Sequence, residues 1–410
     1  MMQKTVIVVT ALLGVACVAM FFVMWQNGEQ PPPTSNSECQ TFVVLHLDAS
    51  PKARLGALTP LGDGFVVGNG RGELLVFPDL KPDAKPRIYS LSKNPIVAPV
   101  LVKDEVCFVG DTNGRFFAFD PATGEKWSYK TGNQITGSAI WCDGMVIVGS
   151  HDGTLYALDP ETGALKYSVD CDGQINGSPL FLESQHALVF GSCDGLLRKI
   201  DVRTGTILAE INFEHYLPET PALFDGVLYL LTRNFDEPEE DDDNDSDGEN
   251  QGVLAAIDAD SFELLWRVPT RDMYSSTPYA THDFLFLTTY FKGKINVHSR
   301  KDGQFLTTLD TDEKMTTLQA GDDSRVYAVS RLGKLYQWQR EGLQAASLPE
   351  ELQVALLPEG LQVTLLPNNR WNRTQLADLQ TDCIRACLLL GNKLIVADDN
   401  GGLFYYTLSE

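Results

Sequence analysis

Basic residues, histidines and paired cysteines are scarce in this chain of 410 residues. Lysine and arginine number 32 against 55 acidic residues, which gives a formal net charge of −23. Because such a chain repels phosphates, the charge argues against a nucleic-acid-binding protein. The sequence has no CxxC motif and no cysteine–histidine cluster, so nothing in it indicates a zinc site. Seven cysteines follow residue 26, and this odd number argues against a complete disulfide framework.

A long amphipathic helical segment is also missing, and short apolar strands with glycine turns recur in its place. The turn glycines follow one another at intervals of about 40 residues, apart from two longer intervals. They are Gly72, Gly114, Gly153, Gly195, Gly252, Gly293, Gly333 and Gly401. Units of about four short strands at this period predict an all-β fold, an eight-bladed β-propeller over residues 41–410. We expect the segment Thr41–Asp48 to pair beside Leu403–Tyr406 and close the ring.

The two long intervals contain insertions that we interpret as loops within blades. One is the acidic segment 236–251, and the other is the segment 342–368, which repeats a nine-residue phrase. Asp243, Asp245 and Asp247 in the acidic segment precede Gly248, a spacing that favours Ca²⁺ binding. Leu254 stands where a calcium loop has its bidentate glutamate, so a solvated acidic loop is the alternative.

The amino-terminal region contains twenty uncharged residues, from Val6 to Trp25. A helix of that length spans roughly 30 Å, so we predict a signal anchor or transmembrane helix over residues 1–26 and a polar linker over 27–40. Lys4 precedes the apolar run, which places the propeller in the periplasm by the positive-inside rule. A cleaved signal peptide and an outer-membrane lipoprotein attached through Cys17 are the alternatives.

Three segments share a phrase with alanine, aspartate and a large aromatic residue in the same order: AFDPATGEKW (118–127), ALDPETGALKY (157–167) and AIDADSFELLW (256–266). The phrase resembles the tryptophan-docking repeat of the PQQ-like (quinoprotein dehydrogenase-like) propellers. This resemblance implies that the shared positions lock neighbouring blades together. They are Ala118, Asp120, Thr123, Gly124, Trp127, Ala157, Asp159, Thr162, Gly163, Ala256, Asp258 and Trp266. Tyr167 replaces the tryptophan in one copy, and Phe262 replaces the glycine in another.

The resemblance implies a fold and leaves several functions open. Quinoprotein dehydrogenases hold PQQ with adjacent cysteines, a tryptophan and a calcium ion, and no adjacent cysteines occur here. We therefore expect no PQQ, no catalytic residue and no cofactor other than Ca²⁺ in the acidic loop. A single membrane-attached propeller is similar to the BamB family, which implies a non-catalytic scaffold with the BAM complex or nascent outer-membrane proteins as partners. The alternatives are a PQQ-dependent oxidoreductase and a calcium-binding extracytoplasmic sensor or adhesion propeller.

Overall fold

The structure is a computed structural model that describes thirteen segments of the chain. They are residues 44–46, 55–81, 84–234, 252–270, 277–289, 294–310, 315–321, 323–330, 334–340, 371–378, 384–390, 393–398 and 402–407. The contacts divide the chain into Met1–Cys39 with Ser409 and Gln40–Leu408 with Glu410. All described residues belong to the second unit.

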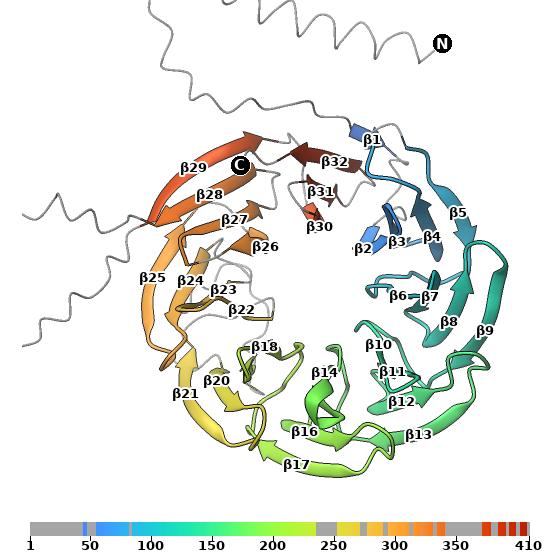
Figure 1. Ribbon diagram of the computed structural model, residues 1–410, viewed down its shortest axis with the longest axis horizontal. Helices are drawn as coiled ribbons and strands as arrows, with labels where there is room; N and C mark the ends of the chain where they lie inside the picture. The colour runs from blue at the N-terminus through green and yellow to red at the C-terminus, as the bar shows by residue number, and fades with distance from the viewer. Residues whose placement is uncertain are drawn as a thin grey trace, which may run out of the picture. The chain divides into compact units, whose positions relative to one another are not determined.

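The described strands form eight four-stranded antiparallel sheets, which follow one another around a ring (Figure 1). We number these blades in chain order. Blades 1 to 4 contain β2 (Leu55–Leu61), β3 (Gly64–Asn69), β4 (Glu73–Phe77) and β5 (Arg87–Ser90); β6 (Leu101–Lys103), β7 (Val106–Gly110), β8 (Arg115–Asp120) and β9 (Gly124–Lys130); β10 (Ile140–Cys142), β11 (Met145–Gly149), β12 (Thr154–Leu158) and β13 (Leu165–Asp170); and β14 (Leu180–Leu182), β15 (Ala187–Gly191), β16 (Leu196–Asp201) and β17 (Ile207–Asn212).

The other four blades have the same order of strands from the centre outwards. Blades 5 to 8 contain β18 (Ala222–Phe224), β19 (Val227–Leu231), β20 (Gly252–Asp258) and β21 (Leu264–Thr270); β22 (Tyr279–Ala280), β23 (Phe284–Thr288), β24 (Lys294–Ser299) and β25 (Phe305–Asp310); β26 (Met315–Gly321), β27 (Arg325–Ser330), β28 (Lys334–Arg340) and β29 (Trp371–Asp378); and β30 (Ile384–Leu390), β31 (Lys393–Asp398) and β32 (Gly402–Thr407) with β1 (Val44–His46).

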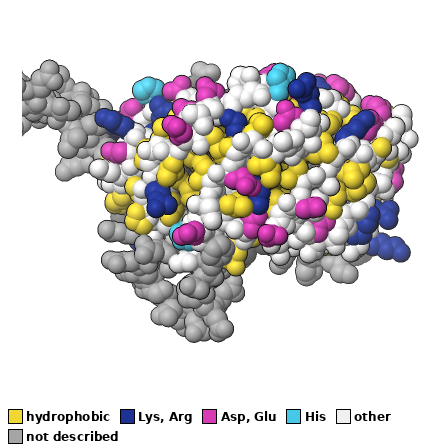
Figure 2. Space-filling model, turned by 90° about the horizontal axis from the view of Figure 1, so that it is seen from below, with side chains coloured by type: hydrophobic (Ala, Val, Ile, Leu, Met, Phe, Trp, Pro, Cys, Tyr) yellow, Lys and Arg dark blue, Asp and Glu magenta, His cyan; other side chains and the backbone are white. Residues whose placement is uncertain are grey.

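Burial follows the position of a strand within its blade. Every residue of the second strand β11 is buried, because both of its faces pack against neighbouring blades. The outermost strand β13 has a mostly exposed pattern, and Figure 2 shows apolar and charged side chains interspersed on the outer side of the ring. The core therefore lies between blades: Ile147 of blade 3 shares one cluster with Leu188 and Phe190 of blade 4.

Glycine is required at the hairpin turns between the second and third strands. Gly153 has a φ of +89°, a conformation that residues with a Cβ rarely adopt. A Cβ at this position would also lie 2.7 Å from the carbonyl oxygen of Cys171. The repeated glycine in the sequence thus reflects both the turn and the close approach of the next segment.

The ring closes as the sequence predicts, through a strand from the beginning of the chain. Val44 of β1 pairs with Phe404 of β32, and His46 pairs with Gly402. Blades 1 and 8 also share a buried cluster that contains Phe65 and Ile395. For the described residues 44–46, this pairing confirms the predicted closure of the ring.

Both insertions lie outside the described residues, yet the strands around them pair with each other. Leu231 pairs with Leu254 across the acidic segment 236–251, and Arg340 pairs with Trp371 across the segment 342–368. Each insertion therefore connects consecutive strands of one blade, in blades 5 and 7.

The predicted N-terminal transmembrane helix is contradicted. Within the described residues, no helix is long and apolar enough to cross a membrane. The helix η2 (Glu183–Gln185), which lies in the described part of the chain, has three residues, whereas a spanning helix needs about 20 apolar residues. Residues 1–26, where the anchor was predicted, lie outside the described residues, as do the linker 27–40 and Cys17. The prediction of membrane anchoring through this helix, and of a location that depends on it, is therefore wrong.

Candidate functional site

Aromatic side chains of the outermost strands contact the turn of the following blade. Trp127 is only 8% exposed, and its indole Nε1 donates a hydrogen bond of 2.8 Å to the carbonyl oxygen of Pro160. Its ring covers Gly163, where a Cβ would lie 2.6 Å from the ring and where φ is +70°. Only glycine fits this position, because a side chain would clash with the indole.

The same contact recurs between other blades. Tyr89 donates to the carbonyl of Pro121 at 2.9 Å, and Tyr167 donates to the carbonyl of Val202 at 2.6 Å. Each acceptor directly follows the aspartate of the receiving turn. Trp266 covers Gly303 in the same way as Trp127 covers Gly163. By contrast, a Cβ on Gly124 would meet nothing within 4 Å, so this glycine serves its own turn, with φ +105°.

The small alanines of the repeat leave room for these rings. In blades 2, 3 and 5 an alanine of the third strand pairs with the aromatic residue of the outermost strand. The pairs are Ala118 with Trp127, Ala157 with Tyr167 and Ala256 with Trp266. All three alanines are completely buried.

The aspartates of the repeat shape the turns that receive the rings. Asp120 accepts hydrogen bonds from the Ala122 N–H at 2.7 Å and from the Thr123 hydroxyl at 2.8 Å. These donors hold the pKa of the Asp120 carboxyl below its usual value, and the Ala122 N–H has the largest effect. Asp159 bonds Thr162 in the same way, and Asp258 accepts from the backbone of Ser261.

The contact between blades 4 and 5 reverses this pattern. Ala209 occupies the aromatic position of blade 4, and the large Lys199 pairs with it, where blades 2, 3 and 5 have alanine. The Lys199 Nζ donates at 3.0 Å to the carbonyl of Ala259, which is the acceptor that follows Asp258. Phe262 replaces the turn glycine with φ +59°, is 6% exposed, and lies 5.5 Å below the Lys199 ammonium. Here the ring comes from the receiving turn and the hydrogen-bond donor from the third strand.

Small polar residues link blades 3 to 6 just before their innermost strands. The Ser138 N–H donates to the Ser178 hydroxyl, and the Ser178 N–H donates to the Thr220 hydroxyl, both at 2.8 Å. The Thr277 hydroxyl then donates to the Thr220 carbonyl at 2.9 Å. Sequence reasoning missed these residues, although each stands directly before an alanine or proline of the repeat.

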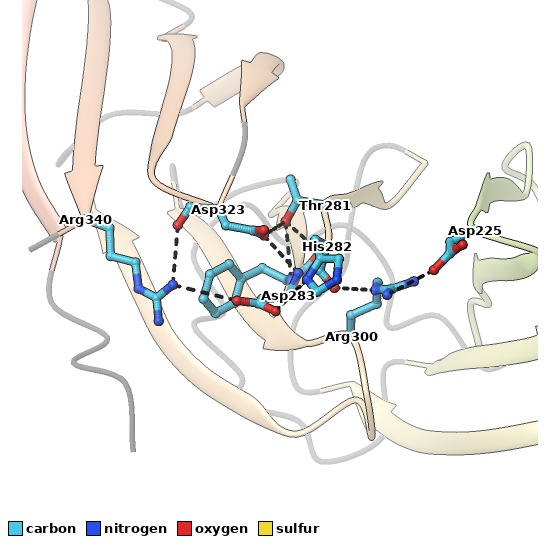
Figure 3. A network of polar contacts seen from close by, with 8 residues as sticks. Asp225, Thr281, His282, Asp283, Arg300, Asp323 and Arg340 are labelled. Carbon is cyan, nitrogen blue, oxygen red and sulfur yellow. Dashed lines mark hydrogen bonds and ion pairs between the residues drawn. The ribbon is translucent and has the colours of Figure 1, made fainter. Parts of the chain in front are cut away.

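Figure 3 shows a polar cluster across the turns of blades 5 to 7. His282, Asp283 and Asp323 each place one potential metal-ligand atom within 4.8 Å of the others. Asp323 Oδ1 already accepts from the Thr281 hydroxyl at 2.7 Å and from the Asp283 N–H at 2.8 Å.

Two arginines extend this cluster to the neighbouring blades. Arg300 Nε donates at 2.6 Å to the carbonyl of His282, and Arg300 Nη2 lies 3.5 Å from Asp225 Oδ2 of blade 5. Arg340 of blade 7 lies 4.0 Å from the Asp283 carboxylate. The cluster therefore joins three blades through hydrogen bonds and opposite charges.

Three thiols of the described residues are poorly suited to nucleophilic chemistry. Cys107, Cys142 and Cys171 are free. Burial raises the pKa of Cys107 and of Cys142 to about 12, and that of Cys171 to about 11, so these groups stay protonated at neutral pH. Asp243, Asp245 and Asp247 lie outside the described residues, so their predicted calcium binding stays a prediction.

The described histidines take part in local hydrogen bonding. His151 contacts Gln134 and the Thr136 hydroxyl, at 3.0 and 2.7 Å, and burial lowers the pKa of its imidazole. His298 contacts the carbonyl of Gly303 at 2.8 Å. These contacts hold turns and segments of the blades in place.

Comparisons with known proteins agree with this architecture. A family model described as outer membrane protein assembly factor BamB matches residues 126–208. The crystal structure of BamB from Moraxella catarrhalis superposes with a TM-score of 0.64 at 17% identity, covering 90% of this chain and 98% of that one. The computationally designed Ika8 protein gives a TM-score of 0.63 at 16% identity, covering 87% and 97%. No curated protein sequence matches the chain. The chain is thus a propeller of PQQ-like repeats that resembles BamB.

Proposed function

We propose that this protein is a non-catalytic scaffold that binds other proteins and assists the assembly of outer-membrane β-barrels. The observation that carries the proposal is the match of residues 126–208 to the family model described as an assembly factor. That segment runs from Lys126 in β9 to Leu208 in β17, and it contains two of the blade contacts described above.

The chemistry of the described side chains supports a scaffold. Trp127 and Tyr167 donate to carbonyls of neighbouring blades, and Lys199 does the same. The charged cluster around Asp323 likewise connects turns. These groups connect neighbouring blades of the ring, and a connected ring suits the presentation of loops and strand edges to partners.

Reconstitution tests the proposal directly. Purified BAM complex in lipid vesicles is given an unfolded outer-membrane protein, and the rate of its folding is measured with and without this protein. We expect a faster rate, and we expect the protein to co-purify with the BAM complex. An equally acidic, unrelated protein serves as the control for charge.

Two results would contradict the proposal. One is an unchanged folding rate together with no binding to the BAM complex. The other is the appearance of a quinone absorbance and dye-linked oxidation of alcohols or sugars after addition of PQQ and Ca²⁺, since this result would show a quinoprotein enzyme.

A further inference from the structure

Blades 4, 5 and 6 expose large apolar side chains at the beginning of their outermost strands, and the outermost strands of blades 1 and 3 expose Ile88 and Leu165. We define the apolar rim as Ile207 and Leu208 of β17, Leu264 and Leu265 of β21, and Phe305 of β25. Their exposed fractions are 45, 54, 41, 52 and 56%. The three strands follow one another along the outside of the ring (Figure 1). Single exposed apolar residues are common, but a series over three adjacent blades indicates an interaction surface.

The repeat itself shows that the fold does not require apolar residues here. In blades 4 and 5, each pair stands directly before the docking position, which Ala209 and Trp266 occupy. The same two positions in blade 2 are Glu125 and Lys126, before Trp127. Blade 2 nevertheless forms the same four-stranded sheet and makes the same ring contact. The apolar rim therefore has a role other than folding.

The strand β17 offers a backbone edge beside these side chains. It is the last strand in the order β14-β15-β16-β17, and no strand of the described segments pairs with its outer edge. Its six residues include no proline or glycine. The neighbouring edge of β21 contains Pro269, which lacks a donor, and the exposed Arg267, and both features disfavour strand addition. Of the edges of β17 and β21, the edge of β17 is therefore the better acceptor of an added strand.

Charge decides what kind of partner fits. The net charge of −23 opposes the close approach of a second copy of this chain. The exposed acidic residues Asp260 and Glu263 lie four positions and one position before Leu264. A basic segment is attracted by both the local and the total charge.

We propose that the apolar rim binds an extended segment of a partner protein that alternates apolar and basic residues, and that this segment adds as a strand to β17. This inference rests on the proposed scaffold function and names its binding surface. Backbone hydrogen bonds along β17 supply affinity, while the apolar side chains of the segment contact Leu208 and Leu265.

A fluorescently labelled short peptide that alternates valine and lysine is the probe, and anisotropy with the full chain measures its binding. We expect the double variant Leu208→Lys/Leu265→Lys to bind at least about tenfold more weakly than the unchanged protein. Glu125→Lys in blade 2 is the matched control, because it changes the net charge by the same amount as the two leucine replacements together. We expect this control to bind as tightly as the unchanged protein. A peptide with prolines in place of every second residue should lose binding, because it lacks the donors for strand pairing.

Several results would overturn the inference. Equal binding by the double variant and the unchanged protein would exclude the apolar rim as the binding site of the peptide. Binding of the proline peptide would exclude strand addition. Sedimentation velocity that shows a dimer, lost in the double variant, would assign the rim to self-association. Circular dichroism checks that all variants are folded. Peptide binding that persists while the BAM folding rate is unaffected would reject the assembly role and keep the rim, so the two failures are distinguishable.

Discussion

The reversed contact between blades 4 and 5 predicts that the effect of Ala209→Trp on the free energy of unfolding depends on whether Phe262 is present. We first consider the replacement of Phe262 alone. Phe262 is only 6% exposed, so the loss of its ring in Phe262→Gly should lower the free energy of unfolding by about 3–5 kcal/mol. It also relieves the left-handed backbone at φ +59°, which returns about 1–2 kcal/mol. The expected net loss in the free energy of unfolding is about 2–4 kcal/mol, since Lys199 also loses the ring beneath it.

We expect Ala209→Trp to destabilise the unchanged protein and to stabilise the Phe262→Gly variant. In the unchanged protein the indole competes with Phe262 for space, because Ala209 packs against the cluster that contains that ring, and overpacking costs about 1–3 kcal/mol. In the Phe262→Gly background the indole meets a turn glycine, as Trp127 meets Gly163, and we expect it to restore at least about 1 kcal/mol.

Urea unfolding followed by circular dichroism measures the four proteins of this cycle. Phe262→Ala is the matched control: it loses the ring but keeps the strained backbone, so it should be less stable than Phe262→Gly by about 1 kcal/mol. If Ala209→Trp has the same effect in both backgrounds, the two residues do not share one space and the reasoning fails.

Three further predictions concern the repeat and the acidic loop. Trp127→Ala should lower the free energy of unfolding in urea by about 3–5 kcal/mol, and a change below about 1 kcal/mol would contradict a docking role. The lowered pKa of Asp120 means that its stabilisation is complete above the unfolded pKa near 4 and is lost as pH falls through the lower folded pKa. Urea midpoints measured from pH 5 to about pH 2 should therefore fall, and less steeply for Asp120→Asn. Calorimetric titration with Ca²⁺ should give heat that Asp245→Ala removes, whereas no heat with the unchanged chain would reject the site.

The sequence predicts the architecture well because the same turn residues recur in several units of the repeat. The Asp-Gly hairpins and the phrase around Trp127 each need a specific backbone shape, and those needs are visible as residue types at fixed spacing. The pairing of β1 with β32 was predictable for a similar reason, since a closed ring leaves one strand to complete its last blade.

The contacts around Lys199 and around Asp323 were less predictable. Phe262 stood out as a departure from glycine, but nothing near it in the sequence identifies Lys199 as its partner 63 positions earlier. The cluster of His282, Asp283 and Asp323 likewise combines turns of two blades. Sequence spacing reports local geometry, whereas these contacts depend on how adjacent sheets face each other. The apolar rim became visible only when equivalent positions of several blades could be compared on the outside of the ring.

The pairing of β1 with β32 has a consequence for the order of events during synthesis. Val44 and its partner Phe404 stand 360 positions apart. At about 5–20 residues per second, a ribosome needs roughly 20 to 70 seconds to make the partner strand after β1 has been made. Intermediate blades can form during that delay, but β1 has no place in the ring until the last blade exists. The ring can therefore close only after the final few dozen residues have been made. A chain truncated before Gly402 would leave β1 unpaired at one end and an incomplete blade at the other.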